Sequence, residues 1–177
     1  SQAVAPMWCR CMPTERIGGL GEVIRRYTEY PEDIAHVNAI LNHPSIHPWV
    51  AVDSAPWDMA QYLARDDVYV LFGQFGGQVY HRVGPETYEV HSAYLPEARG
   101  RVALAATKET LRWMFERTDA KEILTRVPRG NLAAKTLARA CGLRHVTVMP
   151  AGWVRNDQPI PCDLMSLTRQ DWVTKCQ

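Results

Sequence analysis

The chain has 177 residues, of which 20 are basic and 19 acidic, so its formal net charge is +1. A hydrophobic share of 46% excludes intrinsic disorder, and a single domain of this size buries about 70% of its unfolded surface. The near-neutral charge argues against a broad surface for nucleic acid or a membrane, although it leaves room for a small anion site.

The first third of the chain predicts one strand and two helices around a long loop. Glu22–Thr28 is the expected strand, and Pro31 begins a helix in which Ile34, Val37 and Leu41 recur at helical spacing. The proline-containing stretch 44–56 indicates an irregular loop, and a short helix follows near residues 56–65.

The middle of the chain predicts an antiparallel meander. Its three strands are connected by short turns that contain glycine, and they cover Val68–Phe72, Gln78–Val83 and Thr87–Leu95. Val68–Phe72 is continuously apolar, which is typical of a buried strand.

Helices and strands alternate in the last part. The expected elements are a helix over Arg99–Thr118, a strand over Glu122–Val127, a helix over Asn131–Cys141, strands over Arg144–Met149 and Cys162–Thr168, and a polar tail. Asn131 is suited to the N-cap of its helix, and Gly142 to the position just after it. A crossover helix after a meander makes one parallel step, so the sequence predicts a mixed α/β (α+β) domain.

Thiols and histidines give no sign of a staple. Five cysteines are an odd number, and the Cys9-x-Cys11 pair is too closely spaced for a usual zinc knuckle. Pro44 interrupts any helix that would align His43 with His47. With no stretch that resembles a membrane span or a signal peptide, we expect a cytoplasmic protein with reduced thiols and no metal.

The turn Pro96–Gly100 connects a strand directly to a helix, where free amides and the helix dipole suit a phosphate. Arg99 and Arg101 add positive charge there. A plain helix start remains the alternative, because a single glycine matches neither a Walker A loop nor a dinucleotide fingerprint.

Three segments resemble motifs of the GNAT superfamily of N-acetyltransferases, over roughly residues 22–168. These are Tyr94–Arg101 (YLPEARGR), Asn131–Leu137 (NLAAKTL) with Gly142-Leu143, and the closing stretch Leu164–Trp172 (LMSLTRQDW). The chain also resembles a subgroup found in phage and prophage genomes. The resemblance implies a single domain over 1–177, a mostly antiparallel sheet of about seven strands with splayed fourth and fifth strands, and acetyl-CoA in the gap. Homodimers are common in this fold.

Carried over by position, the resemblance implies the residues that bind acetyl-CoA. Pantetheine would pair with the strand edge at Ala93, Tyr94 and Leu95, and Asn131 would contact it or bound water. The pyrophosphate would lie near Arg99, over the amides of Gly100, Arg101, Val102, Ala103 and Leu104. Val102 and Leu104 depart from the family pattern, which has small residues at these two positions. Ala138 stands where many members carry a tyrosine general acid.

Transfer of an acetyl group to an amine needs a base, and Glu89 and His91 are the candidates. They are two residues apart on one strand, so their side chains share a face, and some members place a catalytic glutamate at the position of Glu89. A solvated glutamate and a structural histidine are the plain alternatives. Trp49 and Trp57 flank the loop that covers the acceptor pocket in this superfamily, and they either shape that pocket or simply pack the loop.

Two other functions remain open beside acyl-CoA-dependent transfer to an amine. One is a non-catalytic GNAT-fold module, such as a phage structural or regulatory protein, which the departures at Val102, Leu104 and Ala138 favour. The other is a domain that binds an anionic ligand unrelated to CoA. The acceptor itself is not encoded in any motif of residues 30–65 and could be a small amine, an antibiotic, a peptide N-terminus or a protein lysine.

Overall fold

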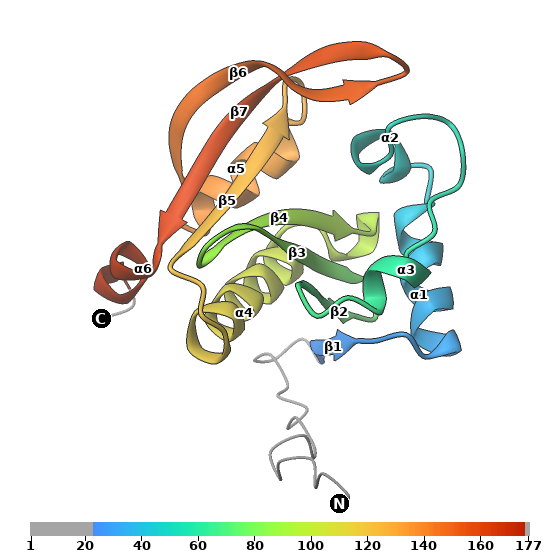
Figure 1. The fold of residues 1–177 in the computed structure, drawn as a ribbon, viewed down its shortest axis with the longest axis horizontal. Coiled ribbons are helices and arrows are strands. Elements are labelled where there is room, and N and C mark those ends of the chain that lie inside the picture. Colours follow the sequence, from blue (N-terminus) through green and yellow to red (C-terminus); the bar gives the residue numbers. More distant parts are fainter. Residues whose placement is uncertain (1–22, 176–177) are drawn as a thin grey trace, which may run out of the picture.

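The computed structural model describes residues 23–175, in which seven strands form one sheet in the order β1-β2-β3-β4-β5-β7-β6 (Figure 1). The strands are β1 (Arg25–Tyr27), β2 (Val68–Gly73), β3 (Gly76–Gly84), β4 (Thr87–Tyr94), β5 (Glu122–Pro128), β6 (Arg144–Arg155) and β7 (Gln158–Thr168). Every neighbouring pair is antiparallel except β4 and β5, which are parallel. The predicted mixed, mostly antiparallel sheet is therefore confirmed.

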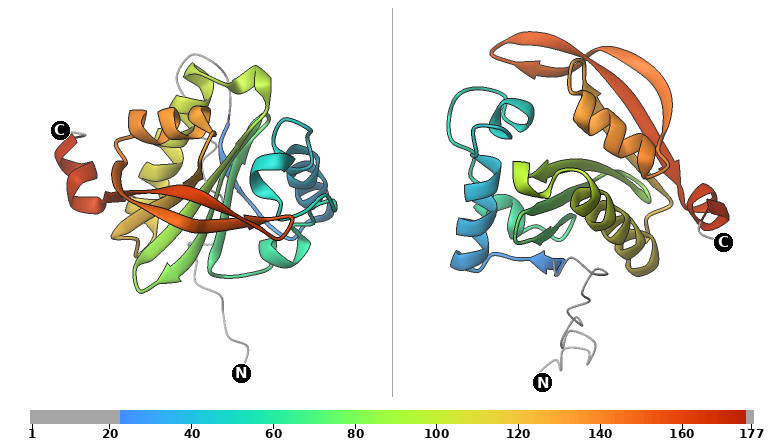
Figure 2. Two further views of the ribbon diagram at one scale, coloured as in Figure 1. Left: turned by 90° about the horizontal axis from the view of Figure 1, so that it is seen from above. Right: turned by 180° about the vertical axis from the view of Figure 1, so that it is seen from behind.

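Helices cover both faces of the sheet (Figure 2). They are α1 (Pro31–Leu41), α2 (His47–Val50), α3 (Ala60–Leu63), α4 (Arg101–Arg117), α5 (Leu132–Ala140) and α6 (Arg169–Lys175), with a 3-10 turn at Pro96–Ala98. The two views show α4 and α5 on one face and α1 to α3 on the other.

The capping signals of the sequence operate as expected. Pro31 is the first residue of α1. The side-chain oxygen of Asn131 accepts a hydrogen bond from the Ala134 amide at 3.1 Å and so caps α5. Gly142 adopts a φ of +94° just after α5, a conformation that glycine takes without strain.

Three local expectations were wrong. The stretch that we expected to be a polar tail forms α6, because Trp172 stacks on Phe115 with ring centroids 5.3 Å apart. The stretch expected to be an irregular loop contains the four-residue helix α2. The last two strands are longer than expected and meet in a tight turn, in which Asn156 and Asp157 have φ of +48° and +59°.

The sheet divides between β4 and β5. These strands pair at three positions only, Thr87 with Glu122, Tyr88 with Ile123 and Glu89 with Leu124. Beyond that point β4 continues beside β3 as far as Tyr94, and β5 continues beside β7 as far as Pro128. The predicted splay of the fourth and fifth strands is thus present.

Side-chain packing on the α4 face spans the division. One buried cluster includes Tyr80 and Tyr88 of the first four strands, Leu111 and Met114 of α4, and Ile123 of β5. A second cluster packs α1 against the other face of β2. The two halves of the sheet are therefore held together mainly by side chains under α4.

Candidate active site

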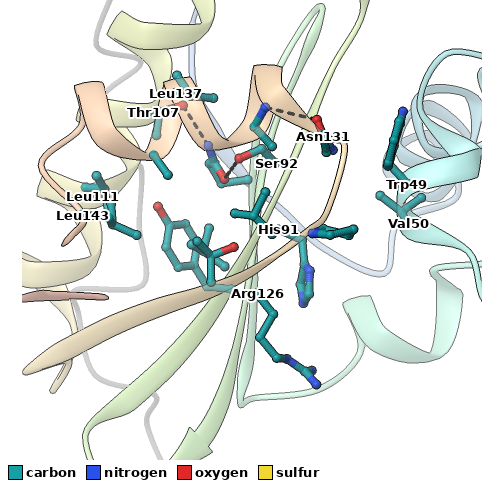
Figure 3. Close-up of a pocket in the computed structure, with 18 residues that line it drawn as sticks. Trp49, Val50, His91, Ser92, Thr107, Leu111, Arg126, Asn131, Leu137 and Leu143 are labelled. Atoms are coloured by element: carbon teal, nitrogen blue, oxygen red, sulfur yellow. Dashed lines mark hydrogen bonds between the residues drawn. The ribbon is translucent and has the colours of Figure 1, made fainter. Parts of the chain in front are cut away.

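A cavity lies where β4 and β5 diverge, with α4 and α5 beside it and α2 across from them (Figure 3). Its wall is formed by both diverging strands and by these helices. In Figure 3, Trp49 and Val50 of α2 lie on one side, with Leu111 and Leu143 on the other. Asn131 also lines the cavity.

A chain of hydrogen bonds at the wall of the cavity ties β3 and β4 to α4. The Gln78 amide donates to Thr107 Oγ1 at 2.8 Å, and Ser92 Oγ donates to Gln78 Oε1 at 2.9 Å. The Tyr94 hydroxyl and Thr107 Oγ1 are 2.9 Å apart. Gln78, Ser92 and Thr107 line the cavity, whereas Ala93, Tyr94 and Leu95 do not. The Leu95 amide donates to the Phe75 carbonyl at 2.9 Å and the Leu95 carbonyl accepts from the Ala98 amide at 3.0 Å, so the backbone of Leu95, which we expected to pair with pantetheine, is bonded within the chain instead.

The start of α4 offers backbone donors. Gly100 adopts a φ of +89° immediately before the helix, and no side chain caps the helix end. The first amides of a helix have no partner within it, so those of Arg101, Val102 and Ala103 point out of its end. The Leu104 amide instead donates to the Gly100 carbonyl at 3.0 Å, which removes it from the expected phosphate-binding set.

Arginines lie at this helix end as the sequence indicated. Arg99 and Arg101 are both exposed, and Arg99 donates to Ser45 Oγ at 3.1 Å. Val102 and Leu104 are half-buried, and Val102 packs against the cluster that contains Ala103. The bulk of Val102 is therefore accommodated toward the protein interior.

Glu89 is 2% exposed and is held by Arg126 of β5. Arg126 Nε donates to Glu89 Oε1 at 2.7 Å, and Nη2 donates to Oε2 at 3.0 Å. Arg126 Nη1 donates to the Gly152 carbonyl of β6 at 2.7 Å. Arg126 lines the cavity and Glu89 does not, so Arg126 is a site residue that sequence reasoning missed.

Two histidines flank the Glu89 carboxylate. His91 Nε2 is 3.9 Å from Oε1, and His81 Nε2 of β3 is 3.6 Å from Oε2. The imidazole rings are parallel, with centroids 5.3 Å apart and an interplanar angle of 3°. Glu89 and His91 do share a face, and His91 lines the cavity.

Both imidazoles have a lowered pKa and are neutral near pH 7. Loss of solvation lowers the pKa of His91, with His81 and Arg126 acting in the same direction and Glu89 opposing them. Since 43% of the His91 side chain is exposed, solvent limits the size of this shift. The pKa of His81 is also lowered, mainly by loss of solvation, with Arg126 adding to the effect and Glu89 opposing it. A neutral imidazole can accept a proton or use its lone pair as a ligand.

The tip of the β6–β7 hairpin is fastened to α2 on the far side of the cavity. Arg155 Nη1 donates to the carbonyls of Pro48 at 2.6 Å and Ala51 at 2.8 Å. The Asn156 amide donates to the Val52 carbonyl at 2.8 Å. Trp57 instead stacks on Tyr62 and packs the loop, so of the two tryptophans considered it is Trp49 that lines the cavity.

His43 Nδ1 contacts Ser45 Oγ at 2.8 Å and His47 Nε2 contacts the Ala55 carbonyl at 2.8 Å, so these two histidines have separate partners. Cys141 and Cys162 are free thiols, while Cys9, Cys11 and Cys176 lie outside the described residues. Within residues 23–175, no helix is both long enough and apolar enough to cross a membrane.

A family model described as "Protein of unknown function (DUF2824)" matches residues 33–177, and the chain belongs to that family. A curated relative, "Putative protein p31" of Acyrthosiphon pisum secondary endosymbiont phage 1, is 28% identical over 85 residues. The match covers 48% of this chain, and the chain spans about half (55%) of the length of that phage protein.

Solved structures show which fold the chain has. A probable acetyltransferase of the GNAT family from Chromobacterium violaceum is 18% identical, with a TM-score of 0.72 over 92% of this chain and 96% of that one. Ribosomal-protein-S5-alanine acetyltransferase from Vibrio fischeri is 16% identical, with a TM-score of 0.68 over 85% and 94%. Spermidine N-acetyltransferase from Vibrio cholerae, in complex with CoA and spermine, is 13% identical, with a TM-score of 0.69 over 85% and 98%. The chain has the GNAT fold.

Proposed function

We propose that this member of the DUF2824 family binds acetyl-CoA or another acyl-CoA and transfers the acyl group to an amine. The observation that carries the proposal is the cavity at the division between β4 and β5, which begins beyond Glu89 and Leu124. An extended thioester can lie along such a gap with its carbonyl beside β4. A solved protein of the same fold holds CoA together with the amine spermine.

Each part of the cofactor has a matching group in the chain. The amides of Gly100 to Ala103 at the start of α4 would bind the pyrophosphate, with Arg99 and Arg101 adding charge. Backbone groups of Ala93 and Tyr94 would pair with pantetheine, and Asn131 would contact it from α5. Leu95 is left out of this set, because its amide and carbonyl bond to Phe75 and Ala98. A β4 amide would donate to the thioester oxygen as negative charge develops there.

The amine would enter from the α2 side, past Trp49 and Val50. Its nitrogen attacks the carbonyl carbon, the C–S bond breaks, and the amine proton leaves through His91, either directly or through water. Both oxygens of Glu89 accept hydrogen bonds from Arg126. The negative charge of Glu89 would stabilise His91 once His91 has taken up the proton. The CoA thiolate takes its proton from solvent, because Ala138 supplies no acid.

Binding is tested by calorimetry with acetyl-CoA on a matched pair of variants. Ala134 lines the cavity, whereas the neighbouring Ala133 is exposed on the same helix. Ala134→Phe should weaken acetyl-CoA binding by about 10-fold or more, which is about 1.4 kcal/mol or more of binding free energy. The reason is that the phenyl ring would fill part of the cavity and remove apolar contacts between the cofactor and α5. Ala133→Phe should leave it unchanged. Absence of binding by the unaltered chain at millimolar acetyl-CoA would refute the proposal.

A non-catalytic GNAT-fold module is the second candidate, and a particular observation favours it. Both oxygens of Glu89 are engaged by Arg126, so its carboxylate is less available as a base than in a site where it stands free. Thiol release from acetyl-CoA across a panel of amines separates the two candidates. Release that falls in His91→Ala supports the transferase, whereas acetyl-CoA binding without release from any amine supports the module.

A further inference from the structure

The β3–β4 hairpin brings three ligating groups together at one place on the sheet. His81 pairs with Glu89 across the hairpin, and His91 lies two residues further along β4 on the same face. One nitrogen of each histidine and one Glu89 oxygen all lie within 4.8 Å of one another. The side chains of His81 and His91 are 33% and 43% exposed, so the cluster can be reached from solvent.

The spacing within this cluster fits a metal ion better than it fits hydrogen bonds. The nitrogen–oxygen distances of 3.6 and 3.9 Å exceed the 2.7–3.2 Å of ordinary hydrogen bonds. Ligand atoms around tetrahedral zinc, with bonds of about 2.0–2.1 Å, stand about 3.4 Å from each other. The two distances run to different oxygens of Glu89, so side-chain rotation has to accompany binding for both imidazoles and the carboxylate to meet at one ion.

We propose that His81 Nε2, His91 Nε2 and the Glu89 carboxylate form a site for a late first-row divalent ion such as Zn²⁺. Two imidazoles with one carboxylate are a ligand set that zinc uses in open, three-ligand sites. The two rings are stacked and parallel, so one imidazole has to rotate for both Nε2 lone pairs to meet at one ion. Of the three proposed ligands, His91 is the one that also lines the cavity.

Arg126 determines how Glu89 can take part. A carboxylate has about four lone-pair sites, and Arg126 uses one on each oxygen, so others remain for an ion. The same two hydrogen bonds fix the carboxylate, as partners of metal-ligating groups commonly do. The positive charge of Arg126 opposes a cation, which predicts a site of moderate rather than extreme affinity.

The metal site stands independently of acyl transfer, although the two share His91. An ion bound to His91 Nε2 takes the lone pair that would accept the amine proton. Zinc should therefore inhibit acyl transfer, if the chain performs it, at concentrations that fill the site. Metal binding itself is measured without acetyl-CoA, so failure of one proposal is distinguishable from failure of the other.

The test is calorimetric titration of the chelator-treated chain with Zn²⁺. His81→Gln should remove one bound ion or weaken the affinity for that ion by about 100-fold or more. Removing only a hydrogen-bond partner of a metal ligand lowers metal affinity by about 10- to 100-fold, so removing a ligand itself should cost at least as much. The matched control is His145→Gln, which alters a histidine 3.0 Å from the carboxylate of Asp163, without a second imidazole in the group. Zinc bound by cysteines would be the same in both variants, so it does not affect the difference in bound zinc between them.

A second measurement uses the unaltered chain, in case His81→Gln disturbs folding. The imidazole nitrogen signals of His81 and His91 in nuclear magnetic resonance spectra should shift together as Zn²⁺ is added. Equal zinc number and affinity in the unaltered chain and a folded His81→Gln would overturn the proposal. Zinc-induced shifts confined to other histidines would overturn it as well.

Discussion

At the scale of single residues, the value of a charged group depends on its partners. Asp33 at the start of α1 is 3% exposed, and its carboxylate accepts hydrogen bonds from Arg25 at 2.5 and 3.0 Å and from the Thr28 amide at 2.9 Å. The hydrogen bonds from Arg25, reinforced by the Thr28 amide, lower the pKa of Asp33 against the opposing effect of burial. Asp33 thus joins β1 to α1 in its ionised form.

Asp33→Asn should therefore destabilise the chain by about 2 kcal/mol near neutral pH, the order expected for hydrogen bonds to a charged group. The carboxylate's contribution is present above the unfolded pKa of about 3.9 and is lost as pH falls through the lower folded pKa. The difference between the two proteins, measured by urea unfolding, should shrink as pH falls toward 3. The exposed Asp66→Asn serves as control, and a difference that stays constant from pH 7 to 3 would contradict the ionic explanation.

Glu89, His81 and Arg126 show what the sequence can reveal about single residues and what it cannot. The shared face of Glu89 and His91 follows from the alternation of side chains along a strand. His81 could also have been found, because a turn near Gly84 and Pro85 sets the hairpin register that places it opposite Glu89. Arg126 comes from a strand 37 residues away, and only the parallel pairing of Glu89 with Leu124 brings it near.

At the scale of elements, the strongest sequence signals were those with a local physical cause. The bounds of α1 and the cap of α5 follow from proline, asparagine and glycine chemistry within a few residues. By contrast, the expected strands over Arg144–Met149 and Cys162–Thr168 were too short, because the hairpin continues through Pro150, Pro159 and Pro161. Proline is tolerated in β6 because this strand is at the sheet edge, where the register shifts between Met149 and Trp153. Helix α6 depends on a contact of Trp172 with distant Phe115, which no local pattern encodes.

The contact between the β6–β7 hairpin and α2 yields a prediction at this scale. Arg155→Ala removes the hydrogen bonds to the Pro48 and Ala51 carbonyls, so amides of residues 47–52 should exchange hydrogen about 10-fold faster or more, for a local loss of over 1.4 kcal/mol. The core under α4 is not involved, and global unfolding should change little.

Hydrogen exchange measured by mass spectrometry checks this expectation. The control is Arg144→Ala, which removes an exposed arginine from the same strand, 3.9 Å from Asp171. Equal exchange of residues 47–52 in both variants would show that Arg155 does not hold α2 against the hairpin.

At the scale of the whole molecule, the sheet consists of two parts that differ in how they are connected. The β1–β4 part and the β5–β7 part are each built from antiparallel pairs, and three parallel residue pairs connect them. The alternation of elements with one crossover helix let the sequence predict this topology. The place where the strands part could be assigned only through resemblance, because it depends on side-chain packing under α4 rather than on the strands themselves.

This arrangement predicts two cooperative units in native-state hydrogen exchange. Backbone amides in the β2–β3–β4 ladders should open with one free energy, and those in the β5–β7–β6 ladders with another. Measurement at increasing urea concentrations would resolve the two. A single isotherm for both groups at every urea concentration would show that the three residue pairs and the core already couple the parts completely.

The short β4–β5 ladder also has a mechanical meaning. Force applied across the sheet, from β1 toward β6, meets its weakest backbone connection at the three pairs between Thr87 and Glu89 on one side and Glu122 and Leu124 on the other. Under such a force, β4 and β5 should separate first, while the β1–β4 part and the β5–β7 part each remain folded. The force is resisted there mainly by the packed side chains around Leu111 and Met114, which contact both parts of the sheet.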